Sequence, residues 1–378
     1  MKKTLMAAAV AATLSTGAAN AVVINLIDDG TVAGSASELG FQIAAEYWSE
    51  LLVSDAVINL GISFAALSPG VIGSTGSTKS DFAIEDWHNT FNSTKSNSTI
   101  DQTIVLPSLS GPDNGISGLT AGVDATGNND NTVTALLDGT QTASQTLYMN
   151  TSLIKGMLGL DIPTLIDGNM SFSSDFSFDF DPTDGVDAGT FDFIGVAIHE
   201  MGHALGFVSG VDFFDIYGTG GPGYGALGYD LNDTSIFSAL DMFRYSAEDT
   251  LDFRTGGNSY FSIDGGKTAL FGNTMSTGRY TGDGQQASHF KDLGGCSGQL
   301  GIMDPNFCFG QMGEVTGLDL ASYDAMGWNL SQDALTYGSR TTAQIYAQVP
   351  EPSTWAILIG ALGLVGARFR KKSASKVN

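Results

Sequence analysis

The chain has 378 residues and carries 40 acidic against 16 basic side chains, a formal net charge of −24. A field of that sign repels nucleic acid, so the composition argues against a nucleic-acid-binding function. Glycine is frequent, at 49 residues, which favours short strands and long loops over a helical bundle. Two cysteines are too few for a disulfide scaffold.

The N-terminus predicts a secretory signal peptide over residues 1–21. Lys2 and Lys3 give a positive start, a short apolar stretch follows, and Ala19-Asn20-Ala21 fits the small-x-small cleavage rule. Cleavage after Ala21 leaves a body that is exported to an oxidising compartment.

The body predicts one α+β domain of roughly 325 residues. Residues 22–26 and 57–67 read as strands. Residues 38–53 place apolar side chains every four positions, which is typical of one face of an amphipathic helix. Residues 93–131 are polar and predict a loop with short strands, and the alternation over 170–180 predicts a half-buried edge strand.

The segment 193–205 predicts a mostly apolar helix with two histidines on one face. His199 and His203 are four residues apart, so a helix brings their rings close enough to bind one Zn²⁺. Glu200 follows the first histidine and can lean towards a zinc-bound water without being a ligand. It would take a proton from that water during attack on a peptide carbonyl.

A catalytic zinc needs a third protein ligand and one position open to water. The remaining histidines are His88 and His289. No motif surrounds His88, which we interpret as a packed or surface side chain. His289 precedes a Gly-Ile-Met303-Asp segment by a short stretch and is the remaining histidine that could serve as the third ligand.

The run from His199 to Gly206, His-Glu-x-x-His-x-x-Gly, resembles the start of the metzincin zinc motif. The resemblance implies a two-lobed zincin fold with a twisted sheet and an active-site helix that ends at the glycine. It also implies a methionine turn beneath the metal, and Met303 matches that role.

The sequence departs from the usual metzincin pattern at Ser209, where a third ligand normally stands. Leishmanolysin-like metzincins carry an inserted segment before the third histidine. That arrangement is similar to the spacing here, and it makes residues 212–286 a β-rich insertion ahead of His289. Two alternatives for the third ligand remain open, Asp212 and Glu248; the latter resembles the glutamate of gluzincins.

Three further features of the body lead to structural predictions. Asp179, Asp181, Asp184 and Asp187 form an acidic cluster before the zinc helix; charged turns explain it most simply, and a Ca²⁺ site is the alternative. The cysteines at 296 and 308 bracket Met303 in an exported chain, so we expect a disulfide between them, worth about 3 kcal/mol in the chain-entropy model. Residues 318–328 predict a C-terminal helix.

Residues 346–378 predict a sorting tail. A Val-Pro-Glu-Pro-Ser box at 349–353 is followed by the apolar run 355–367 and a basic end at 368–372. The run is at the lower edge of the length that spans a membrane, and the basic end would stay in the cytoplasm. The order resembles the PEP-CTERM tail of Gram-negative bacteria. The resemblance implies processing by an exosortase, a transient inner-membrane anchor, and delivery to the cell surface or extracellular matrix.

Together these features predict an exported zinc endopeptidase over residues 22–345, acting on a protein or peptide substrate. Two other functions stay open: a zinc hydrolase acting on a different substrate, and a matrix or adhesion protein with a structural metal site. The presence of Glu200 argues against the last, because a structural zinc needs no base.

Overall fold

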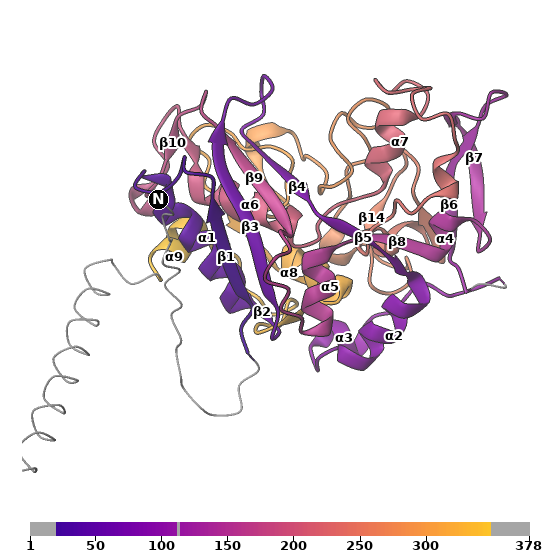
Figure 1. Ribbon diagram of the computed structural model, residues 1–378, viewed down its shortest axis with the longest axis horizontal. Helices are drawn as coiled ribbons and strands as arrows, with labels where there is room; N and C mark the ends of the chain where they lie inside the picture. The colour runs from indigo at the N-terminus through magenta and orange to yellow at the C-terminus, as the bar shows by residue number, and fades with distance from the viewer. Residues whose placement is uncertain (1–19, 112–113, 349–378) are drawn as a thin grey trace, which may run out of the picture.

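The computed structural model describes residues 20–111 and 114–348, so nearly all of the signal peptide and the sorting tail lie outside the described residues (Figure 1). A four-stranded sheet, in the order β1-β3-β9-β4, forms one side of the molecule. Its first three strands are parallel, and β4 is added antiparallel at the β9 edge. The strands are β1 (Val23–Asp28), β3 (Val57–Ala65), β9 (Gly168–Ser173) and β4 (Gly73–Ser77).

One face of this sheet is apolar because alternate side chains point the same way. Ile62 pairs with Met170 and Phe64 with Phe172, and the helices α1 (Ser37–Leu51) and α6 (Phe193–Ala204) cover that face. The other face carries polar pairs such as Ser63 and Ser171. The predicted strands and the amphipathic helix are therefore found, with α1 ending two residues early where β2 (Leu52–Val53) begins.

The predicted edge strand over 170–180 is wrong in two respects. The chain leaves the sheet after Ser173, turns, and forms β10 (Phe178–Asp179), which pairs with β11 (Phe191–Asp192). In addition, β9 is an inner strand, and the edge strand is β4. Of the alternating phenylalanines, Phe172 is buried and Phe178 partly buried, and the two pack against Phe193 at the start of α6 from two separate strands.

The predicted β-rich insertion over 212–286 also differs. It begins inside a helix, α7 (Val211–Tyr217), and its strands are short: β12 (Arg244–Ala247), β13 (Thr250–Asp252) and β14 (Tyr260–Phe261). They complete a five-stranded sheet, in the order β14-β12-β13-β6-β7, with β6 (Ser117–Val123) and β7 (Asn129–Asp138). The segment therefore forms one sheet with β6 and β7, which precede α6 in the chain.

Residues 93–131, predicted as loop with short strands, hold β6, the start of β7 and a short helix. Helix α2 (Ile84–Thr94) overlaps the first two of these residues, and it gives no clear sequence signal because only Ile84, Trp87 and Phe91 carry its apolar face. The remaining elements in chain order are β5 (Lys79–Ala83), α2 (Ile84–Thr94), α3 (Thr99–Thr103), α4 (Thr142–Gln145), β8 (Thr146–Asn150), α5 (Thr151–Leu158), β15 (Glu314–Val315), α8 (Gly317–Met326), β16 (Asn329–Leu330), β17 (Arg340–Thr341) and α9 (Thr342–Tyr346).

The C-terminal helix is found as α8, and it buries an acid that has no hydrogen-bond partner. Neither carboxylate oxygen of Asp324 makes a hydrogen bond, and the side chain is fully buried. Burial, reinforced by the nearby charge of Asp101, raises the pKa of Asp324 to about 8. The folded state therefore holds a proton there that the unfolded chain releases near pH 4.

We expect folding stability to fall as pH rises from about 4 to about 8, because the folded protein must keep Asp324 protonated while the unfolded chain does not. Asp324→Asn should flatten this slope and shift the difference in unfolding free energy between pH 5 and pH 8 by roughly 2 kcal/mol or more. Thermal melts at the two pH values measure it. Asp86→Asn, an exposed acid on α2, is the control; equal slopes in both variants would contradict the prediction.

Candidate metal centre

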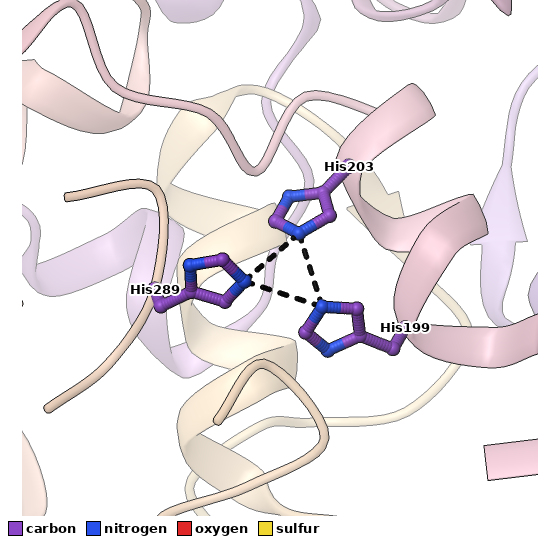
Figure 2. Close-up of side chains that lie close together, drawn as sticks. All are labelled: His199, His203 and His289. Carbon is purple, nitrogen blue, oxygen red and sulfur yellow. Dashed lines mark hydrogen bonds between the residues drawn. The ribbon is translucent and has the colours of Figure 1, made fainter. Parts of the chain in front are cut away.

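Three histidines from two distant segments meet in the structure (Figure 2). The Nε2 atom of His203 lies 3.1 Å from that of His199 and 3.1 Å from that of His289, and the third edge of the triangle is 3.3 Å. All three side chains lie in or next to the core, with His199 and His289 only 7% and 6% exposed. Over residues 20–111 and 114–348, this is the one group of three or more His, Cys, Asp or Glu side chains with the spacing of a metal site.

The ring nitrogens that point away from the triangle fix its chemistry. The Nδ1 of His199 faces the carbonyl of Ile302 at 2.7 Å, and the Nδ1 of His203 faces that of Phe207 at 2.6 Å. A carbonyl only accepts, so each Nδ1 carries the proton and each Nε2 presents a lone pair. Burial also lowers the pKa of His199 to about 4 and that of His203 to about 3, and it lowers the pKa of His289 too.

The Nδ1 of His289 likewise faces a carbonyl, that of Gln286 at 3.3 Å, which leaves its Nε2 with a lone pair as well. Three lone pairs at this distance repel one another unless a cation lies between them. Ligands at the Zn–N distance of 2.0–2.1 Å and at tetrahedral angles are about 3.3–3.4 Å apart. The observed edges of 3.1, 3.1 and 3.3 Å are close to that spacing. The residues present therefore fit a zinc ion with three histidine ligands and one open position.

The helix α6 holds the first two histidines because both of its ends are fixed. Asp192 caps its start by accepting the amide of Gly195, and the same carboxylate accepts the amide of Gly313. At its end Gly206 adopts a φ of +127°, which side chains disfavour. That turn brings the carbonyl of Phe207 back to the ring of His203.

Glu200 lies beside the triangle and is held from strand β4. Its Oε2 accepts the hydroxyl of Thr75 at 2.7 Å, and the side chain is only 6% exposed. Burial raises the pKa of Glu200 to about 7, with the Thr75 hydroxyl opposing the rise. Gly73 lies two residues before Thr75 on β4 and packs closely against Glu200. A Cβ at this position would lie 2.6 Å from Oε1 of Glu200.

Gly73→Ala should displace the Glu200 carboxylate. For the general-base role that the sequence predicts for Glu200, turnover should then fall by about 10-fold or more, because a general base must be held in place to act. The zinc content should not change, since Glu200 is not a ligand. Gly76→Ala in the same strand is the matched control, because a Cβ there meets nothing within 4 Å. Steady-state cleavage rates and metal analysis of both variants test this; equal activity of the two would contradict it.

Met303, the residue expected to form the methionine turn, packs against α6 next to His203 and bonds to the residue after His289. It is fully buried, and a Cβ on Gly202 of the zinc helix would lie 2.6 Å from its sulfur. Asp319 on α8 accepts the main-chain amides of Ile302 and Met303 and so fixes the turn. The predicted disulfide between Cys296 and Cys308 is present and closes the loop around this turn.

The alternatives for the third ligand lie elsewhere. The carboxylate of Asp212 accepts hydrogen bonds from the loop that carries His289, and Glu248 lies in an exposed pair with Lys267. Ser209 donates its hydroxyl to Asp241. The structure thus brings His289, and neither alternative, to the other two histidines.

The acidic cluster before the zinc helix does not gather its carboxylates into one group. Asp179 accepts the amides of Asp181 and Asp187, and Asp181 accepts from Thr183. These are turn and capping interactions of exposed residues, so the Ca²⁺ alternative gains no support. His88 is separate from the metal centre: it packs edge-on against Trp87, and burial lowers its pKa.

Two parts of the centre give no signal in the sequence. Strand β4, with sequence Gly-Ser-Thr-Gly-Ser, has no apolar residue and so gives no periodic signal. The role of Asp212 as a partner of the His289 loop was likewise hidden, because its partners lie 75 and 76 residues away.

Comparison with known proteins identifies the tail. Residues 348–372 match the PEP-CTERM protein-sorting motif. The chain is therefore an exported protein that an exosortase recognises, that is processed at the membrane, and that is attached to the cell surface. The apolar run 355–367 lies outside the described residues, and no helix in the described part is long and apolar enough to cross a membrane.

No curated protein and no solved structure matches the chain. The metzincin resemblance therefore rests on the zinc helix, the third histidine and the methionine beneath them, and the two-lobed zincin fold class stays a prediction.

Proposed function

We propose that the protein is an exported zinc-dependent endopeptidase with a metzincin-like catalytic domain. The observation that carries the proposal is the triangle of three Nε2 lone pairs with the buried carboxylate of Glu200 beside it. Zn²⁺ held by His199, His203 and His289 would activate water and polarise a substrate carbonyl.

The protein's own residues supply the proton handling. Glu200 directly follows His199 on α6, and its carboxylate is held by the hydroxyl of Thr75. A carboxylate in this place can accept the proton that the attacking water loses and pass it to the leaving amine. Because Glu200 is not needed to hold a metal, its burial beside three ligands favours a catalytic centre over a structural one.

A peptide is the substrate class that the surroundings of Glu200 favour. Strand β4, which carries Thr75, is the edge strand of its sheet, so one row of its main-chain amides and carbonyls is unpaired within the sheet. An extended peptide can add to such an edge as a further strand. A peptide bound along β4 would lie beside Glu200, which supports peptide over other hydrolysable substrates.

The test compares the zinc-loaded protein with the same protein after chelation. We expect one zinc per chain and cleavage of unfolded casein or a peptide library that disappears with the metal and returns with Zn²⁺. Zinc binding without cleavage of any peptide would instead favour a hydrolase for another substrate, or a matrix protein with a structural metal site at the surface of a Gram-negative cell.

A further inference from the structure

His289 differs from the other two ligands in how it is held. His199 and His203 lie on a helix and make Nδ1 contacts of 2.7 and 2.6 Å, whereas the Nδ1 of His289 is 3.3 Å from the carbonyl of Gln286. Residues 286–289 form no helix or strand. The position of the His289 ring therefore depends on what holds the main chain of this loop.

The downstream side of the loop is held by main-chain bonds. The carbonyl of His289 accepts the amide of Ser276, and the amide of Phe290 donates to the carbonyl of Met303 at 3.1 Å. These bonds tie the loop to the methionine turn. They leave the upstream residues, Ala287 and Ser288, to be fixed by something else.

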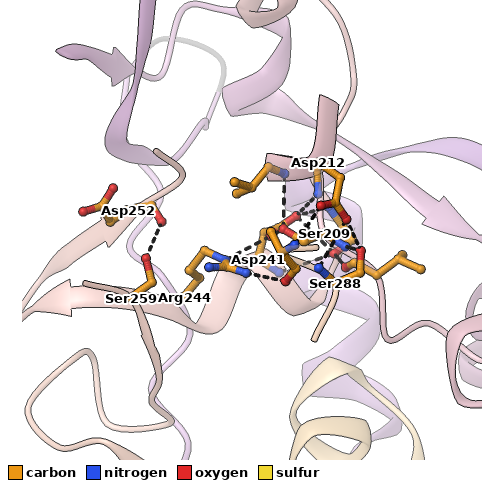
Figure 3. A network of polar contacts seen from close by, with 12 residues as sticks. Ser209, Asp212, Asp241, Arg244, Asp252, Ser259 and Ser288 are labelled. Carbon is orange, nitrogen blue, oxygen red and sulfur yellow. Dashed lines mark hydrogen bonds and ion pairs between the residues drawn. The ribbon is translucent and has the colours of Figure 1, made fainter. Parts of the chain in front are cut away.

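The upstream side is held by Asp212 at the start of α7 (Figure 3). Its carboxylate accepts the amide of Ala287 at 2.7 Å, the amide of Ser288 at 3.2 Å and the hydroxyl of Ser288 at 2.5 Å. The Ser288 hydroxyl in turn accepts the amide of Ser209 at 2.8 Å. Ser209 and Asp212 both lie in the segment that follows α6, the helix that carries His203. This segment therefore also holds the loop before His289 through hydrogen bonds.

A buried arginine completes this support. Arg244, which is fully buried, donates to the carbonyl of Ala287 at 2.6 Å and to that of Ser276 at 2.9 Å. Its Nε lies 3.6 Å from Asp241, whose carboxylate also accepts the hydroxyl of Ser209 and the amide of Gly210. The charges of one arginine and two aspartates thus lie around the same loop in a region with little solvent.

We propose that Asp212 is the positioning residue for the third metal ligand: it fixes the loop so that His289 completes the triangle. The inference rests on the proposed zinc function and deepens it. Asp212 is not itself a ligand, and it acts through the main chain of residues 287 and 288. Outer partners of metal ligands usually contribute 10- to 100-fold to metal affinity, and we expect an effect of about that size.

The chain offers a matched control on the same helix. Asp215 also accepts several loop hydrogen bonds, from the amides of Arg279, Tyr280 and Thr281. These three residues lie at the tip of the same segment, beyond the Gly278–Gln285 bridge, and not next to His289. Asp212→Ala and Asp215→Ala therefore remove a similar number of hydrogen bonds, but only the first is expected to loosen His289.

The experiment measures zinc affinity by competition with a chromophoric chelator, together with the visible absorption of the Co²⁺-substituted site and the melting temperature without metal. Asp212→Ala should bind zinc about 10- to 100-fold more weakly and should alter the absorption bands of the Co²⁺-substituted site. Asp215→Ala should keep the zinc affinity and the Co²⁺ bands of the wild type. Equal zinc affinity in the Asp212→Ala variant and the wild type would overturn the inference. Equal losses of affinity in both variants would also overturn it, because they would indicate general loosening.

A second variant keeps the test decisive if Asp212→Ala does not fold. Ser288→Ala removes the hydroxyl that links Asp212 to Ser209 but leaves the main-chain amides in place, and a smaller loss of zinc affinity in the same direction is expected. Unchanged affinity there, with no folded Asp212→Ala protein, would count against the proposal. A wild-type protein that binds zinc but cleaves no peptide would refute only the proposed peptidase function, whereas one that binds no zinc would refute both.

Discussion

Replacing Glu200 by glutamine is expected to lower peptide cleavage by about 10³-fold or more while the protein keeps its zinc. Glutamine has nearly the same shape, and its oxygen can still accept the hydroxyl of Thr75. The substitution removes the group that takes up the proton, and it leaves the three histidines untouched. Initial rates on a peptide substrate and zinc content by elemental analysis measure the two effects separately.

The control for this experiment is Glu85→Gln, at an exposed acid on α2 outside the metal centre. It should cleave as the wild type does. Full activity in a folded, zinc-loaded Glu200→Gln variant would refute the mechanism proposed here, because the reaction would then not depend on Glu200 as its base. A loss of zinc together with activity would mean that Glu200 supports the metal itself.

The second large effect is expected at His289. His289→Ala should weaken zinc binding by at least about 100-fold, since it removes one of three protein ligands and leaves only the pair on the helix. Competition titration with a chelator measures the affinity directly. Cleavage at limiting zinc should fall in parallel and recover partly when excess zinc is supplied.

His88→Ala is the natural control, because His88 is the fourth histidine of the chain and packs against Trp87 away from the centre. This variant is expected to lose some stability but to bind zinc normally. Unchanged zinc affinity in His289→Ala would falsify the assignment of the third ligand. Asp212 and Glu248 would then be the remaining candidates for that ligand.

The sequence by itself determined the parts of this protein that depend on short-range order. The spacing of His199 and His203 fixes their common face, because any α-helix brings positions four apart together. The sorting tail is defined by the linear order of its box, apolar run and basic end, and its motif is found at residues 348–372. The disulfide of Cys296 followed from there being only two cysteines in an exported chain.

Tertiary structure alone decided the rest of the metal centre. His289 is 86 residues from His203, and the sequence offers three candidates for the third ligand. In the structure the carboxylate of Asp212 accepts hydrogen bonds from the loop that carries His289, so Asp212 supports this loop and is not a ligand itself. Strand β4 supplies Thr75 from a segment of glycine, serine and threonine with no apolar pattern. Such segments have weak local preferences, so their place is set by long-range hydrogen bonds and close packing against α6, which no short stretch of sequence encodes.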